Sequence, residues 1–183
     1  MGVSDEQLML AYAGGDARAF ETLYAKHKGG LYRFVLRSVA ARGEAEELYQ
    51  DVWLRVIEAR GRYAPQAKFT TWLYTIAHNR LVDHWRSRGL VLVSLDAEDA
   101  APPEPAAPPS SQPHLQVEAR QMLERLAAAI AALPFVQREA FLMHQEGGMS
   151  VAEIAQATGV NEEAAKSRLR YATAKLMEAI GDD

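Results

Sequence analysis

The stretch that decides the fold covers residues 150–180 and reads SVAEIAQATGVNEEAAKSRLRYATAKLMEAI. Ser150 with Glu153 three residues later is a capping box, which predicts the start of a short helix. Gly159 then favours a turn, and Asn161 is a common first cap for a second, longer helix. This order predicts a helix-turn-helix, whose second helix enters the major groove of DNA. A plain two-helix corner on the protein surface would give the same pattern, so both interpretations stay open at this point.

The second helix of this pair has two different faces. Apolar residues at spacings of three and four predict its buried stripe, which consists of Ala165, Leu169, Ala172, Leu176 and Ile180. The opposite face is polar and partly basic, with Glu163, Ser167, Arg170, Tyr171 and Ala174 in the centre and Lys166, Arg168 and Lys175 on the flanks. Glu163 stabilises the positive end of the helix dipole as a simple cap, or its carboxylate accepts a hydrogen bond from cytosine.

Composition limits the class of protein. The chain has 183 residues, a net charge of −4 and no cysteine, which excludes a disulfide framework and a thiolate zinc site. No apolar run approaches the roughly 18 residues that would span a membrane. The polar residues 4–7 precede any apolar segment, so the N-terminus does not resemble a signal peptide. We therefore expect a cytoplasmic protein without membrane insertion, of one or two domains.

A proline-rich and acidic segment divides the chain. Six prolines fall within residues 102–113, and such a segment is expected to form an extended connector. Residues 65–89 carry four basic side chains and one acid, whereas residues 90–118 carry five acids and no lysine or arginine. The sequence predicts an all-α fold with two small helical domains, at 1–89 and 116–183, joined by a linker at 90–115. The second domain contains the helix-turn-helix.

Helical periodicity and caps predict the individual elements. In the first domain we expect helices at about 5–13, 16–39, 44–59 and 70–88, and the pair Gly29-Gly30 either lies inside the second helix or breaks it. In the second domain we expect helices at about 116–132 and 135–146 before the helix-turn-helix. No strand alternation is present in either domain.

Two helices of the first domain carry unusual surfaces. The third has an apolar stripe of Leu48, Val52 and Val56, with acids near its start that are either solvated or bound by a basic partner. The fourth mixes tryptophan and tyrosine with arginine, histidine and asparagine. Aromatic rings stack on unpaired bases and cations follow phosphates, so this mixture suits single-stranded nucleic acid. An aromatic core helix with basic flanks is the alternative for each ring.

Several of these segments together resemble one family. Residues 46–56 (EELYQDVWLRV) and 69–83 (FTTWLYTIAHNRLVD) resemble the promoter-melting domain of extracytoplasmic-function (ECF) sigma factors of the sigma-70 family. Residues 133–134 (LP), 137–141 (QREAF), 148–155 (GMSVAEIA) and 166–169 (KSRL) resemble the domain of the same family that reads the −35 promoter element. The two matches occur in the family's order across a linker.

The resemblance implies partners and a role for particular residues. The third helix would bind the clamp helices of the RNA polymerase β′ subunit through Glu47, Gln50, Asp51 and Leu54. The loop at 61–68 before the fourth helix, and the fourth helix itself, would hold the melted −10 element, with candidate residues Ala64, Gln66, Ala67, Lys68, Phe69, Trp72, Asn79, Arg80, His84 and Arg86. The −35 element would meet Glu163, Lys166, Ser167, Arg168, Arg170, Tyr171 and Lys175. The family also implies contact with the β flap, promoter DNA as the nucleic-acid partner, and binding by an anti-sigma factor in some members.

One segment departs from the family pattern. Recognition helices of the family often open with small residues and carry an arginine near position 171, whereas Glu162 and Glu163 open this helix and Tyr171 faces outward. The identity of the −35 sequence is therefore left open.

Other functional classes have less support. The five histidines lack the spacing of a zinc site, and no phosphate-binding glycine loop or nucleophile elbow is present, so we expect no metal, no cofactor and no catalysis. A two-domain regulator that binds operator DNA without polymerase remains the main alternative, and a pure protein-interaction module is the third.

Overall fold

The computed structural model describes residues 2–89 and 114–181, and every regular element within them is helical. The first half contains α1 (Asp5–Ala13), α2 (Ala17–Ser38), α3 (Arg42–Ala59), the short 3-10 helix η1 (Arg60–Arg62) and α4 (Phe69–Ser87). The second half contains α5 (His114–Ala132), α6 (Phe135–Gly147), α7 (Val151–Thr158) and α8 (Glu162–Gly181). The all-α prediction is confirmed, and each helix expected from the sequence is present with ends within two residues of the prediction.

The expected linker at 90–115 lies outside the described residues except for its last two positions, and those belong to α5. The boundaries of the two domains therefore stay a prediction. Within residues 2–89 and 114–181, no helix is long and apolar enough to cross a membrane.

Local signals explain where the helices of the helix-turn-helix begin and end. The Ser150 side chain accepts from the Glu153 backbone N–H at 3.2 Å, and the Glu153 carboxylate accepts from the Ser150 backbone N–H at 2.7 Å. Gly159 adopts the left-handed conformation (φ 69°) that ends α7, which only glycine adopts at little cost. Asn161 then caps α8 by accepting from the Ala164 N–H at 2.8 Å. The predicted caps are confirmed.

The predicted apolar stripes face one continuous core. Leu48, Val52 and Val56 of α3 are buried, as are Ala165, Ala172 and Leu176 of α8, while Leu169 and Ile180 are half-buried. The core also includes Leu73, Ala77 and Leu81 of α4. These buried side chains form a single cluster that extends through both halves of the chain rather than two separate cores.

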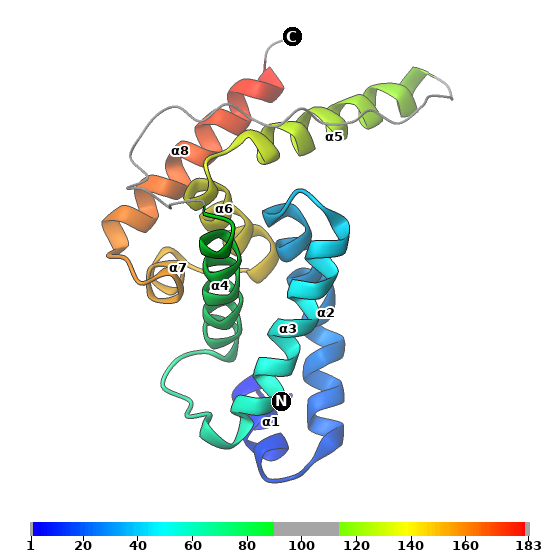
Figure 1. The fold of residues 1–183 in the computed structure, drawn as a ribbon. Coiled ribbons are helices and arrows are strands. Elements are labelled where there is room, and N and C mark those ends of the chain that lie inside the picture. The colour runs from blue at the N-terminus through cyan, green and yellow to red at the C-terminus, as the bar shows by residue number, and fades with distance from the viewer. Residues whose placement is uncertain (1, 90–113, 182–183) are drawn as a thin grey trace.

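The two halves pack directly on each other. Helix α2 packs against α6, and α4 packs against α7, as Figure 1 shows. The pair Gly29-Gly30 lies inside a continuous α2, and Gly30 faces the end of α6 so closely that an added Cβ would lie 2.8 Å from the Glu146 backbone oxygen. The glycine therefore serves close helix packing instead of breaking the helix. Helix α5 leaves the body beside α8 and projects away from the other helices (Figure 1).

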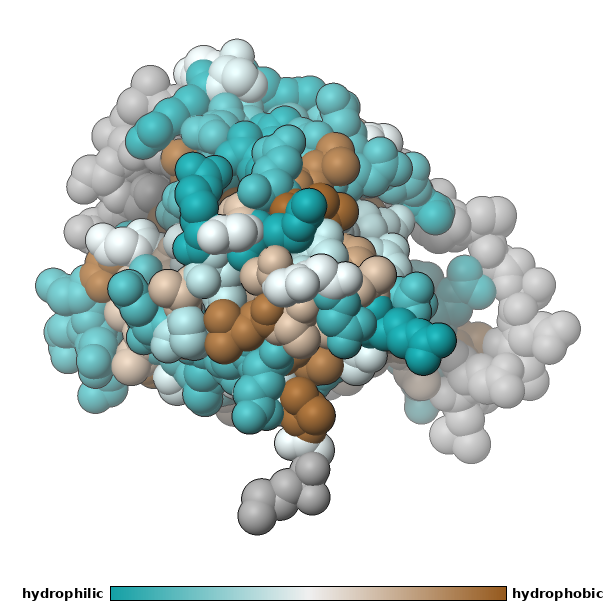
Figure 2. Space-filling model, turned by 90° about the horizontal axis from the view of Figure 1, so that it is seen from below, coloured by the Kyte–Doolittle hydropathy of each residue, from teal (hydrophilic) through white to brown (hydrophobic). Residues whose placement is uncertain are grey.

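The end of the molecule that carries α1 and the segment between η1 and α4 has a polar surface. Seen from that side, hydrophilic residues dominate and apolar residues form small groups between them (Figure 2). The loop between η1 and α4, which carries candidate −10 residues, belongs to this polar end of the molecule.

Candidate nucleic-acid interface

The candidate polymerase-binding residues lie on the outer side of α3. Glu47, Gln50 and Leu54 are exposed, and the Leu54 side chain is 55% accessible although leucine is usually buried. An exposed leucine beside acidic and amide side chains offers both an apolar and a charged contact to a partner.

Asp51 is paired with a basic side chain of its own chain. Its Oδ2 accepts two hydrogen bonds from Arg80 of α4, from Nε at 2.9 Å and from Nη2 at 2.8 Å. The side chain of Asp51 is only 35% exposed and that of Arg80 20%. The structure thus brings together a candidate polymerase residue and a candidate DNA residue, and each orients the other.

The loop before α4 combines exposed and buried residues. Ala64, Gln66 and Lys68 are exposed, Ala67 is half-buried, and Phe69 is fully buried. Phe69 therefore supports the loop from within the core, while the other four lie at or near its surface.

An aromatic cluster lies beneath this loop. The ring of Tyr63 lies 5.0 Å from that of Trp72 and 6.4 Å from that of Phe69, measured between ring centroids. Burial, followed by the nearby carboxylates of Glu6 and Asp5, raises the pKa of Tyr63 to about 12. Half-buried Trp72 belongs to this cluster, so its ring fixes the shape of the loop.

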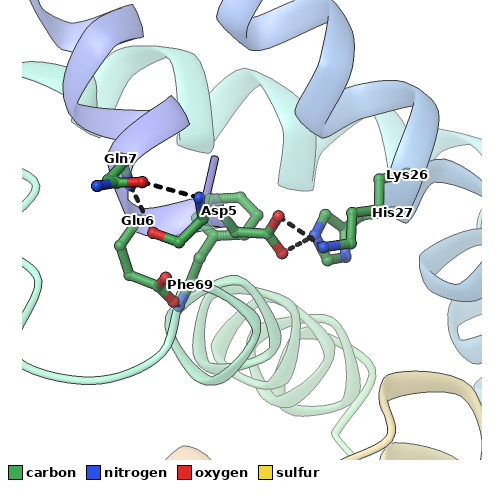
Figure 3. A network of polar contacts seen from close by, with 7 residues as sticks. Asp5, Glu6, Gln7, Lys26, His27 and Phe69 are labelled. Carbon is green, nitrogen blue, oxygen red and sulfur yellow. Dashed lines mark hydrogen bonds and ion pairs between the residues drawn. The ribbon is translucent and has the colours of Figure 1, made fainter. Parts of the chain in front are cut away.

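Helix α4 begins with a cap supplied by another helix. Lys68 occupies the N-cap position but its side chain makes no capping hydrogen bond. Instead, the Glu6 carboxylate of α1 accepts from the Phe69 backbone N–H at 2.7 Å (Figure 3). This hydrogen bond is the main cause that holds the pKa of the Glu6 carboxyl below its usual value. The carboxylate also lies at the positive end of the α4 dipole, where an anion is stabilising.

A second network fixes α1 on α2. Asp5 accepts from the Lys26 ammonium at 2.8 Å and contacts His27 Nε2 at 2.7 Å, and Figure 3 shows the three side chains converging. Burial works against ionisation of Asp5, but these hydrogen bonds outweigh it and keep the pKa of its carboxyl below the usual value. Helix α1 thereby positions the loop of the candidate −10 site, a role that the sequence alone did not assign to it.

The remaining −10 candidates on α4 fall into two groups. Asn79 and Arg86 are exposed and free to meet a ligand, whereas the side chain of His84 is only 12% exposed. Burial, and secondly the positive charge of Arg80, lower the pKa of His84 below its ordinary value. The His84 ring lies beside that of Trp85, with ring centroids 5.3 Å apart, and its role at the −10 element stays a prediction.

The candidate −35 residues line the solvent side of α8. Glu163, Lys166, Arg170, Tyr171 and Lys175 are exposed, and Ser167 and Arg168 are half-buried. The guanidinium of Arg170 lies 5.1 Å from the centroid of the Tyr171 ring, and Tyr171 is 52% exposed. A guanidinium at this distance from an aromatic ring is attracted to it, so these two side chains lie together at the centre of the predicted reading face.

The residues that join the two halves were not predicted from the sequence. Lys68 contacts Glu153 of α7 at 2.7 Å, His78 contacts Glu139 of α6 at 2.7 Å, and Glu146 of α6 lies between two arginines of α2. No local pattern signals these pairs, because each joins side chains that are far apart in the sequence. No group of three acidic or histidine side chains suited to a metal ion occurs in the part of the chain that the structure describes.

Comparison with known proteins defines the class. Residues 23–91 match the family described as Sigma-70 region 2, and residues 123–176 match Sigma-70, region 4. The chain therefore belongs to the sigma-70 family of RNA polymerase sigma factors.

Individual relatives place it within that family. The chain is 36% identical to RNA polymerase sigma factor CarQ of Myxococcus xanthus over 95% of this chain and 96% of the relative. It is 30% identical to the ECF RNA polymerase sigma factor SigM of Mycobacterium tuberculosis over 97% of this chain and 85% of the relative. The sigma factor RpoE of Bartonella quintana, solved with the anti-sigma factor NepR, shares the fold with a TM-score of 0.68 at 23% identity, covering 91% of this chain and 99% of that one. The chain is thus an ECF member of the sigma-70 family.

Proposed function

We propose that this protein binds core RNA polymerase, recognises the −35 and −10 elements of a promoter, and melts the DNA to start transcription. The observation that carries the proposal is the presence of both family regions in order, with an exposed candidate reading face on α8 and an exposed edge on α3. An operator-binding regulator would need the reading face on α8 but not the exposed edge on α3.

The outer edge of α3 is the proposed contact with the β′ clamp helices. Glu47 and Gln50 present charge and hydrogen-bonding groups, and Leu54 presents an apolar side chain that a partner would cover. Asp51 completes this edge, but its orientation depends on Arg80. A clamp surface that carries basic side chains would be attracted to the acids and would bury the leucine.

The exposed part of the η1–α4 loop and of α4 is the proposed site for the melted −10 element. Gln66 and Lys68 lie on the loop, and Asn79 and Arg86 lie on the helix, where amide and cationic groups can meet bases and phosphates. Phe69 and Trp72 fix the loop from the core side. Base capture would then depend on a loop whose shape is set in advance by the aromatic cluster and by the Glu6 cap.

The outward face of α8 is the proposed reader of the −35 element. Arg170 and Tyr171 lie at its centre, and Lys166 and Lys175 flank them in positions suited to phosphate contacts. The β flap of the polymerase is the proposed partner of the second half of the chain. The proposed place of action is the cytoplasm, where the polymerase is present, and the proposed regulator is an anti-sigma factor.

Core-dependent DNA binding tests the proposal. Purified chain, core polymerase and the two together are compared in gel-shift assays on promoter fragments selected from a random library. We expect a specific complex only when both proteins are present. Specific binding of duplex DNA by the chain alone, with no effect of core polymerase, would support the operator-binding regulator instead.

A further inference from the structure

Helix α5 extends beyond the other described helices. Its C-terminal part packs on α8, where Ile130 is buried and Leu126 and Ala129 are half-buried. In contrast, every residue from 117 to 125 is exposed, and this part of the helix projects away from the other helices (Figure 1). A helical segment of a few turns is only marginally stable in water without tertiary contacts. The projecting segment 117–125 would therefore gain stability from a partner.

The apolar stripe of α5 continues into the projecting segment. Apolar residues follow one another at alternating steps of three and four, the spacing of a coiled-coil seam, at Ala119, Met122, Leu126, Ala129 and Leu133. Leu133 is buried in the body of the protein, whereas Met122 is 37% exposed and its neighbour Leu123 is 65% exposed. Among the described residues, one half of this stripe is thus covered by the protein and the other half is open to solvent.

The charged residues beside the open half are complementary to themselves. Glu118 comes directly before Ala119 and Arg125 directly before Leu126, so both lie along the same edge of the stripe, seven positions apart. In an antiparallel pair of identical helices the equivalent edges face each other, so Glu118 of each copy would meet Arg125 of the other. Twofold symmetry makes these two contacts equivalent. The open half of the stripe therefore carries the charges that suit a second copy of this chain.

The shape of the molecule favours the antiparallel direction. Each α5 has the body of the protein at its C-terminal end, as Figure 1 shows. A parallel pair would bring two bodies to the same end of the helices, whereas an antiparallel pair separates them. A parallel pair would also place Glu118 opposite Leu123 of the second copy, with no charge to meet it.

We propose that the projecting segment 117–125 of α5 is a self-association surface, at which two copies of this chain form an antiparallel helix pair. Met122 and Leu123 of each copy are covered by the other copy, and Glu118 and Arg125 set the direction. One helix per copy buries less than the about 1,200 Å² of stable complexes, so the dimer is weak and forms as the protein concentration rises. This inference goes beyond the proposed function and does not depend on it, since neither polymerase nor DNA takes part.

Sedimentation equilibrium of the whole chain tests the surface. We expect a monomer at low protein concentration and a dimer at high concentration. Leu123→Glu should abolish the dimer, because it places a charge in the apolar contact. Leu10→Glu is the matched control, since Leu10 is also an exposed leucine (45%) but lies on α1, and it should leave the dimer unchanged. A wild-type monomer at every concentration, or a dimer that survives Leu123→Glu, would overturn the proposal.

Reversal of the two charges tests the pairing itself. Glu118→Arg and Arg125→Glu should each weaken self-association by about tenfold at low ionic strength, because like charges then face each other twice. A mixture of the two variants should associate as the wild type does, because each supplies the charge that the other lacks. Glu124→Arg is the control with the same change of charge, since Glu124 pairs with Arg120 at 3.0 Å within α5, away from the stripe. Failure of the mixture to associate would contradict the pairing, as would an equal effect of Glu124→Arg.

Spin labels measure the direction of the pair. The chain has no cysteine, so Gln121→Cys or Ala127→Cys, both at exposed positions, places one label on each copy. Contact of Glu118 with Arg125 puts the twofold axis between positions 121 and 122. Two labels at 121 should then lie close together, whereas two labels at 127 should be separated by roughly 16 Å more along the helix axis. Equal distances at the two positions would indicate a parallel pair and overturn the proposal.

Discussion

The ion pair between Asp51 and Arg80 leads to the sharpest prediction, because it connects the proposed polymerase edge to the proposed DNA site. Asp51→Ala removes the acceptor of both guanidinium hydrogen bonds, whereas Arg80→Ala removes both donors. If the two side chains act as one unit, the double variant should be little worse than either single variant.

The expected magnitude follows from the geometry. A hydrogen bond to a charged group contributes about 1.5–3 kcal/mol when it is well shielded, and an exposed ion pair contributes about 0–1 kcal/mol. Both hydrogen bonds end on a single oxygen, and the two side chains are 35% and 20% exposed, so the pair lies between these limits. We expect a coupling free energy of about 1–2 kcal/mol.

A double-mutant cycle by urea denaturation measures that coupling, and promoter opening is measured in parallel by permanganate reactivity of thymines. The control cycle uses Arg55 and Asp83, which also join α3 and α4 but lie 3.9 Å apart and are 45% and 55% exposed. That cycle should give a coupling near zero.

Additive stability effects at Asp51 and Arg80 would refute the reasoning. So would a defect in promoter opening on Arg80→Ala that is absent on Asp51→Ala, since Asp51 would then not act through Arg80.

Three further outcomes are expected. Glu6→Gln should weaken the start of α4. The folded pKa of Glu6 lies below its ordinary value, so its contribution to stability is present above about pH 4.3 and is lost as the pH falls further. The thermal transitions of wild type and variant should therefore converge in acid. A constant difference between them down to pH 3 would contradict this. Ser150→Ala should cost about 1 kcal/mol through loss of the α7 cap, measured by urea denaturation, and an unchanged transition midpoint would contradict it. Arg170→Ala should relax sequence preference at one or two −35 positions, by about 1–3 kcal/mol each, whereas Lys166→Ala should weaken the binding of all sequences alike with a smaller salt dependence. Selection from a −35 library checks both predictions. If the Arg170 variant still selects the wild-type motif, this face does not read DNA.

Local rules were enough to predict the helices and their order. Periodic apolar residues and side-chain caps act within one or two turns, so the burial of Leu48, Val52 and Val56 and the caps at Ser150 and Asn161 followed from spacing alone. The order of motifs gave the family and the surfaces on which candidate residues lie.

Contacts between distant residues could not be predicted in this way. Asp51 and Arg80 are 29 positions apart, and Arg33 and Glu146 are 113 apart, so their pairing depends on how helices pack and not on sequence spacing. The sequence also left open whether Gly29-Gly30 breaks α2, because only the approach of α6 reveals why a glycine is required at position 30. The sequence left open whether the acids of α3 are solvated or bound by a basic partner, and it did not predict that Asp51 pairs with Arg80 of the same chain.

Transcription in vitro tests the central claim most directly. Core polymerase is incubated with promoter templates selected from a library, with and without the purified protein, and transcript starts are mapped. We predict transcripts from discrete starts only when both proteins are present, with unpaired thymines upstream of each start near position −10. Transcripts that do not depend on the protein, or no promoter-specific starts despite a stable complex with core polymerase, would contradict its assignment as an initiating sigma factor.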